Sequence, residues 1–129
     1  MDSANVKFLK INYTEILDEL KKYAASKGRS YGTKTIVLVG SLAKGTYTGA
    51  SDADVLIIAD DVPTRPLDRY VLFADATLKV DLEPRVYKTT EFLSKIKEGD
   101  RFAIESLKIG IPLFGAQFFN NLKTQCPTV

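Results

Sequence analysis

The chain has 129 residues, of which 45% are hydrophobic and 26% charged, as in an ordinary globular protein with a single core. Its net charge of +2 gives no strong electrostatic case for a dedicated nucleic-acid binder. The absence of histidine excludes histidine-dependent triads and His-ligated zinc, and the single cysteine, Cys126, excludes an intrachain disulfide and suits a reducing cytoplasm.

The first predicted element is a helix over Tyr13–Lys27. Asn12 and Glu15 resemble a capping box at its start, and Gly28 is a plausible stop. A polar turn, Arg29–Lys34, follows. One face of the helix is apolar at helical spacing and is expected to pack on a core: Ile16, Leu17, Leu20, Tyr23 and Ala24.

Two strongly apolar strands come next. Thr35–Val39 is apolar on both faces, which predicts a central strand that is covered on both sides. Gly40-Ser41 ends this strand, and the following ten residues are expected to form a turn with a short helix at their start. A second strand of the same kind is predicted over Asp52–Ala59.

A helix with Pro66 in its first turn is predicted over Arg65–Thr77, with Leu67, Val71 and Ala74 on one side. The next segment, Leu78–Tyr87, alternates between apolar and polar residues, which is typical of a strand with one polar face. That polar face holds four charged side chains: Lys79, Asp81, Glu83 and Arg85.

Three short elements complete the pattern. They are a helix capped by Thr89 or Thr90 that runs to about Lys97, a helix over Asp100–Ile109, and an edge strand over Ile111–Phe114. The rest of the chain is expected to be a tail. This order predicts an α/β (α+β) domain with a small mixed sheet flanked by helices, as one domain over residues 1–129 with its core at about 35–115.

Acidic residues mark the start of the second strand. Asp52 and Asp54 are two residues apart and face the same side. Such a pair repels by roughly 1–4 kcal/mol near a surface, so it is tolerated when a cation lies between the carboxylates or one of them stays protonated. Oxygen ligands favour Mg²⁺, with Mn²⁺ as the alternative. If the strands are neighbours, Asp81 completes a cluster for two ions; whether Glu83 contributes stays open.

Gly40 and Ser41 suit a phosphate, because glycine lets the backbone approach closely and serine adds a hydroxyl and an N–H donor. Lys44 could add positive charge at the β- or γ-phosphate. Each motif taken alone is more often a solvated turn or ordinary surface charge. Their combination at one end of a sheet is much rarer than its parts.

Gly40-Ser41, ten residues, then Asp52-Ala53-Asp54 resembles the signature of the DNA polymerase β-like nucleotidyltransferase superfamily, and within it the minimal nucleotidyltransferases of prokaryotes. Gly45, Ser51 and the Val80-Asp81-Leu82 segment resemble further family features. The resemblance spans roughly residues 36–115 and implies a polymerase β-like palm fold. Family members commonly have arginine where this chain has Lys44.

The resemblance implies Mg²⁺-dependent transfer of a nucleoside monophosphate, most simply AMP from ATP, to a hydroxyl with release of pyrophosphate. It implies that Asp52 and Asp54 hold two metal ions, while Asp81 binds the catalytic ion and helps to deprotonate the acceptor. The nucleotide would be held by the remaining signature residues: Gly40, Ser41, Lys44 and Ser51.

The short chain leaves little to bind an acceptor, so we expect the acceptor surface on another chain or in a homo-oligomer. Minimal nucleotidyltransferases are often paired with a helical HEPN-domain toxin, and the resemblance implies an antitoxin that places AMP on a partner tyrosine. Two other readings stay open: a non-catalytic nucleotide- and metal-binding module that regulates a partner by binding alone, and a surface turn without a site. A cytoplasmic location is expected, since no apolar run could span a bilayer and the N-terminus does not resemble a signal peptide.

Overall fold

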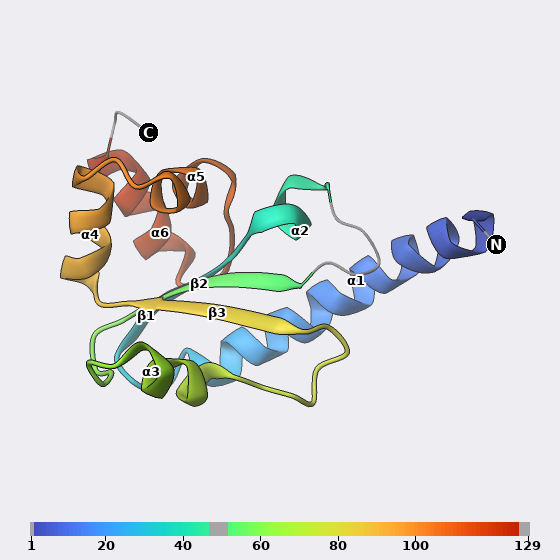
Figure 1. The fold of residues 1–129 in the computed structure, drawn as a ribbon, viewed down its shortest axis with the longest axis horizontal. Coiled ribbons are helices and arrows are strands. Elements are labelled where there is room, and N and C mark those ends of the chain that lie inside the picture. Colours follow the sequence, from blue (N-terminus) through green and yellow to red (C-terminus); the bar gives the residue numbers. More distant parts are fainter. Residues whose placement is uncertain (1, 47–51, 127–129) are drawn as a thin grey trace.

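A four-stranded sheet lies at the centre of the molecule, with helices on both faces (Figure 1). The computed structural model describes residues 2–46 and 52–126. In this part of the chain the strand order is β3-β2-β1-β4. The strands are β1 (Thr33–Val39), β2 (Ala53–Ala59), β3 (Leu82–Tyr87) and β4 (Ile111–Phe114). β1 pairs antiparallel with β2 and β4, whereas β2 and β3 are parallel, which confirms the predicted mixed sheet.

Apart from the short α2, which follows β1 directly, the described helices fall into two layers (Figure 1). One layer holds α1 and α3, the other α4, α5 and α6. Their bounds are α1 (Asp2–Lys27), α2 (Gly40–Lys44), α3 (Pro66–Phe73), α4 (Thr89–Lys97), α5 (Arg101–Ile109) and α6 (Ala116–Gln125). None of the helices in the described part of the chain is both long and apolar enough to span a membrane.

Two hydrophobic cores lie on opposite faces of the sheet because successive strand side chains alternate in direction. In β2, Val55 and Ile57 join the core under α1 and α3, whereas Leu56 and Ile58 join the core under α4 to α6. Burial on both faces explains why the central strands are apolar throughout, as the sequence predicted. Asp54 lies on the second face, and it is not a member of that core.

Helix α1 begins at Asp2, so the predicted start at Tyr13 is wrong. No proline or glycine interrupts residues 2–27, and hydrogen bonding therefore continues through the segment that resembled a capping box. The predicted end is confirmed, because Lys27 is the last helical residue and the ring of Phe114 packs where a Cβ of Gly28 would stand. Leu20, Tyr23 and Ala24 are buried in the first core, as expected.

Helix α3 is shorter than predicted and ends at Phe73 instead of Thr77. Two side chains of α1 bind its last carbonyl groups: the Tyr23 hydroxyl donates to Phe73 at 2.5 Å and Lys27 Nζ to Leu72 at 2.9 Å. These bonds satisfy the carbonyls that a longer helix would have used. The side with Leu67 and Val71 faces solvent, and Arg69 and Phe73 are buried instead.

Three other boundaries differ from the sequence predictions. β3 begins at Leu82 instead of Leu78, because its ladder with β2 starts at the Ala53–Leu82 pair. The cap of α4 is Lys88, not Thr89 or Thr90; the N–H and hydroxyl of Thr89 bond to Asp60 instead. The segment predicted as a tail contains α6, which buries Phe119 and Leu122 in the second core.

Candidate active site

The turn from β1 into α2 brings Gly40 against Asp54. The antiparallel register pairs Val39 with Asp54, so the next residue, Gly40, lies at the end of that pair. Gly40 has φ +71°, and a Cβ at this position would collide with the Asp54 carboxylate oxygen Oδ2. Glycine is therefore required twice, for the positive φ and for the close approach. The contact links the predicted phosphate turn to the predicted metal-binding strand.

Gly40→Ala is expected to lower activity by about 10²-fold, because the methyl group displaces the Asp54 carboxylate from its position. It should also lower the free energy of unfolding by more than the roughly 1 kcal/mol that a positive φ costs alanine. Steady-state rates and chemical denaturation measure the two effects.

Gly99→Ala is the matched control, since Gly99 has φ +77° and no atom within 4 Å of an added Cβ. The Gly99→Ala variant has the free-energy cost of an alanine at positive φ, but its methyl group meets no neighbouring side chain. Equal activity losses in the two variants would show that the contact with Asp54 is unimportant.

The parallel pairing of β2 with β3 gathers the acidic residues. Asp54 is opposite Glu83 in register, and the Ala53 N–H donates to the Asp81 carbonyl oxygen at 2.8 Å. Asp52, Asp81 and Glu83 line one hollow of about 410 Å³. Asp52, Asp81 and Glu83 are exposed to solvent, whereas Asp54 is half-buried. Asp54 does not line this hollow and meets the other acidic residues through its register with Glu83, so the shared metal site of Asp52, Asp54 and Asp81 stays a prediction.

Burial raises the pKa of Asp54, the Arg85 guanidinium lowers it, and the nearby carboxylates of Asp52 and Glu83 raise it further. The net effect is a raised pKa, so the folded protein disfavours ionised Asp54. A divalent cation would relieve this repulsion, and an all-oxygen donor set suits Mg²⁺. As the side chains stand, no three acidic or cysteine residues in the described ranges converge closely enough to hold an ion, so binding one requires them to turn toward each other.

A family model described as nucleotidyltransferase domain matches residues 17–113, which is more than half of the chain. The chain belongs to the nucleotidyltransferase domain family. This finding confirms the resemblance to minimal nucleotidyltransferases and makes the protein a transferase. The matched segment includes the whole sheet apart from the last residue of β4.

Two curated relatives of this nucleotidyltransferase come from Methanocaldococcus jannaschii. "Putative protein adenylyltransferase MJ0141" is 33% identical over 95 residues, which cover 70% of this chain and 95% of the relative. "Putative protein adenylyltransferase MJ1305" is 42% identical over 45 residues, which cover 35% of this chain and 31% of the relative. A chain from a crystal structure of a toxin–antitoxin with AMP-PNP has a TM-score of 0.52 and 17% identity, covering 84% of this chain and 93% of that one. At that identity the structural match supports the fold alone.

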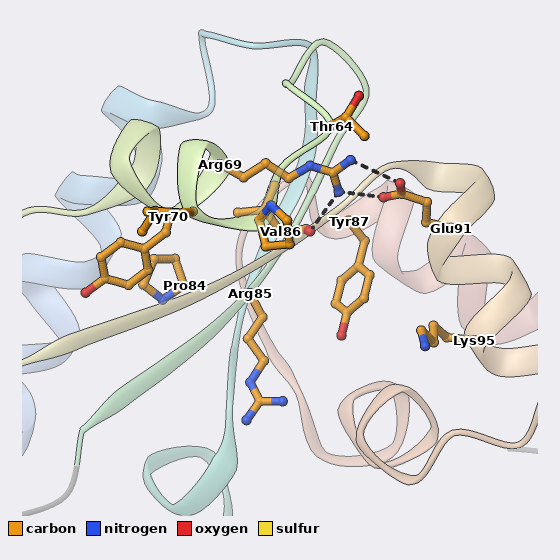
Figure 2. Close-up of a pocket in the computed structure, with 11 residues that line it drawn as sticks. Thr64, Arg69, Tyr70, Pro84, Arg85, Val86, Tyr87, Glu91 and Lys95 are labelled. Atoms are coloured by element: carbon orange, nitrogen blue, oxygen red, sulfur yellow. Dashed lines mark hydrogen bonds and ion pairs between the residues drawn. The ribbon is translucent and has the colours of Figure 1, made fainter.

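Arg85 is a site residue to which the sequence assigned no role. It lies on the polar face of β3, two residues after Glu83, and its guanidinium stands 4.3 Å from the ring centroid of Phe102 on α5. Figure 2 shows Arg85 and Tyr87 pointing to the same side of β3. The alternating charges of this strand were the available signal. The nucleotidyltransferase thus holds a fixed cation beside its acidic cluster.

Lys44 and Ser41 lie on α2, next to the acidic cluster. Lys44 Nζ is 2.9 Å from Glu105 Oε1 of α5, so its charge is paired in this structure. The Ser41 carbonyl accepts hydrogen bonds from the N–H groups of Gly45 and Thr46, which closes the end of the helix. Ser51, the last of the four predicted nucleotide-binding residues, lies outside the described residues.

Proposed function

We propose that this chain is a Mg²⁺-dependent adenylyltransferase that moves AMP from ATP to a tyrosine hydroxyl of a HEPN-domain partner and so acts as an antitoxin. The observation behind this proposal is the Asp54 carboxylate seated against Gly40, in register with Glu83, which lines a hollow together with Asp52 and Asp81. The names of the curated relatives support a protein acceptor. The toxin–antitoxin neighbour with AMP-PNP supports an adenine nucleotide and a toxin partner.

In this proposal Asp52, Asp54 and Asp81 bind two Mg²⁺ ions, which neutralise charge on the phosphates when bound. The backbone at Gly40 and Ser41 holds the triphosphate, and Lys44 exchanges Glu105 for a phosphate oxygen. The acceptor oxygen forms a bond to the α-phosphorus while the bond to the bridging oxygen of the β-phosphate breaks. Pyrophosphate leaves, and the acceptor proton passes to Asp81. Holding and orienting the reactants is most of what phosphoryl transfer requires, and it needs no histidine.

The test uses ATP labelled at the α-phosphate, MgCl₂ and a HEPN-domain protein as the acceptor. We expect label on a partner tyrosine, no label after EDTA, and recovery of label when Mg²⁺ is restored. Mass spectrometry should show one or more added AMP groups on the tyrosine. ATP labelled at the γ-phosphate serves as the control, because that label should appear only in pyrophosphate.

ATP binding without label on any acceptor would contradict transfer and favour the non-catalytic module that regulates a partner by binding alone. Absence of both binding and label would contradict the proposed site itself. Label on a different acceptor would retain the transferase and reject the HEPN partner.

A further inference from the structure

A second groove runs along the free edge of β3, between α3 and α4 (Figure 2). We name it the β3 groove; its cavity of about 770 Å³ is lined by Leu67 and Tyr70 of α3, Arg85 and Tyr87 of β3, and Lys95 of α4, among others. This volume falls in the range of ligand-binding clefts in proteins. Among the residues that the structure describes, no proposed metal ligand or nucleotide-binding residue lines it.

The α3 side of the groove is apolar and exposed. Leu67 is 68% exposed and Tyr70 is 38% exposed, although both belong to a helix that buries Arg69 and Phe73. Single exposed apolar residues are common on protein surfaces. Here they stand beside the edge of a sheet and share a hollow with Tyr87, which suits contact with an apolar or aromatic side chain.

The α4 and β3 sides of the groove are positively charged. Its lining holds three cations and one carboxylate, a net charge of +2. The carboxylate of Glu91 is bound by Arg69 at 2.6 and 3.0 Å, which neutralises both groups (Figure 2). Lys95 comes no nearer than 3.9 Å to Glu98, and Arg85 forms no ion pair with the part of the chain that the structure describes. The charge left over therefore complements an acidic ligand.

The edge of β3 itself is poorly suited to pair with another strand. Pro84 has no N–H to donate, and the Val86 carbonyl already accepts from Arg69 Nη1 at 3.3 Å. Proline on an edge strand is a common device against strand addition. A ligand in this groove is therefore bound mainly by side chains.

The groove leads to the acidic cluster. Tyr70 lines both the β3 groove and the hollow that contains Asp52, Asp81 and Glu83. Arg85 of the groove and Glu83 of the hollow lie two residues apart on the same strand, β3. A polypeptide in the groove can thus extend a side chain past Tyr70 toward the carboxylates.

We propose that the β3 groove binds an acidic segment of the acceptor polypeptide and presents its tyrosine hydroxyl to the carboxylate hollow. The apolar and aromatic lining by Leu67, Tyr70 and Tyr87 packs on the segment, and Arg85 and Lys95 bind its carboxylates. This inference rests on the proposed function, because it supplies the acceptor site of that reaction.

The test uses fluorescently labelled poly(Glu,Tyr), a random acidic copolymer that carries tyrosine, with binding measured by anisotropy in the absence of nucleotide. Leu67→Ser is expected to raise Kd about tenfold, and Val71→Ser to leave it within about twofold. These two residues are a matched pair, because both are exposed apolar residues of α3, 68% and 66%, and only Leu67 lines the groove.

A second matched pair tests the charged side. Lys95→Ala is expected to raise Kd about fivefold, whereas Lys97→Ala, an exposed lysine on the same helix that does not line the groove, should change it less than about twofold. Poly(Lys,Tyr) should not bind. Thermal denaturation of each variant checks that the fold is intact.

Binding and AMP transfer are read separately, so the two proposals fail separately. Equal effects within each pair, or no binding of poly(Glu,Tyr), would overturn the groove proposal even if AMP transfer occurs. Selective loss of binding in Leu67→Ser and Lys95→Ala without any AMP transfer would support the groove as an acidic-peptide site and reject the proposed reaction.

Discussion

Asp54→Asn is expected to lower the rate of AMP transfer by about 10³-fold or more while leaving the free energy of unfolding unchanged or higher. The rate falls because the amide removes a negative ligand from the centre of the cluster, and 10³-fold corresponds to about 4 kcal/mol of transition-state stabilisation. The stability does not fall, because the folded protein disfavours the ionised carboxylate, whose pKa is raised by burial and by Asp52 and Glu83.

Two assays on the same preparation measure this prediction: release of labelled pyrophosphate and urea denaturation without metal. Asp18→Asn, at an exposed position of α1 that lines neither the β3 groove nor the carboxylate hollow, should leave both quantities unchanged. A fully active Asp54→Asn protein would remove Asp54 from the metal site. A large loss of stability would mean that the carboxylate has a structural role that its surroundings do not indicate.

Arg69→Met is expected to destabilise the protein by about 3 kcal/mol, the largest effect on stability that we predict away from the acidic cluster. The Arg69 side chain is only 8% exposed, and it donates to the Pro63 and Val86 carbonyls as well as to Glu91. Methionine replaces the apolar stem but leaves those acceptors without their donor. Urea denaturation of both proteins gives the difference in free energy.

Arg65→Met is the matched control. Arg65 bonds to Asp68 with similar geometry at 3.0 Å, but its side chain is 76% exposed, so water replaces the lost bond. We expect little change in stability. If the two variants lost equal stability, burial would not explain the importance of Arg69.

The pair formed by Arg69 and Glu91 also predicts a pH dependence. Hydrogen bonds from Arg69 lower the pKa of Glu91 to about 2, from an ordinary value of 4.5. Because the folded pKa is depressed, the stabilisation is complete above about pH 4.5 and is lost as the pH falls toward 2. The stability difference between the wild type and Glu91→Gln should therefore shrink across this range in denaturation experiments. A difference independent of pH would contradict the assigned ion pair.

The two central strands and the protein family could be predicted because each depends on residues that are close together in the sequence. Thr35–Val39 and the segment after Asp54 are apolar on both faces, and only a covered strand in the middle of a sheet buries both. The spacing from Gly40-Ser41 to Asp52-Ala53-Asp54 is a property of the sequence alone, and the family match agrees with it. The surface residues next to these motifs showed no spacing or periodicity from which their contacts could be predicted.

Tertiary contacts decided the ends of several elements. α3 stops at Phe73 because Tyr23 and Lys27, about 50 residues earlier in the chain, bind its last carbonyls. β3 starts at Leu82 because its ladder with β2 starts there. Hydrogen bonds between residues so far apart in the chain produce no periodic pattern in the sequence, so they could not be predicted from it.

The sequence by itself determined the family signature, since residue types and spacing pick out Gly40, Asp52 and Asp54 as the predicted site residues without any structure. The tertiary structure decided what stands around them. The parallel register put Glu83 opposite Asp54, and the packing of α5 placed Phe102 under Arg85 and Glu105 beside Lys44. The physical reason is that the identity of each side chain is given by the sequence itself. Its electrostatic surroundings depend on contacts with strands and helices that come together only on folding.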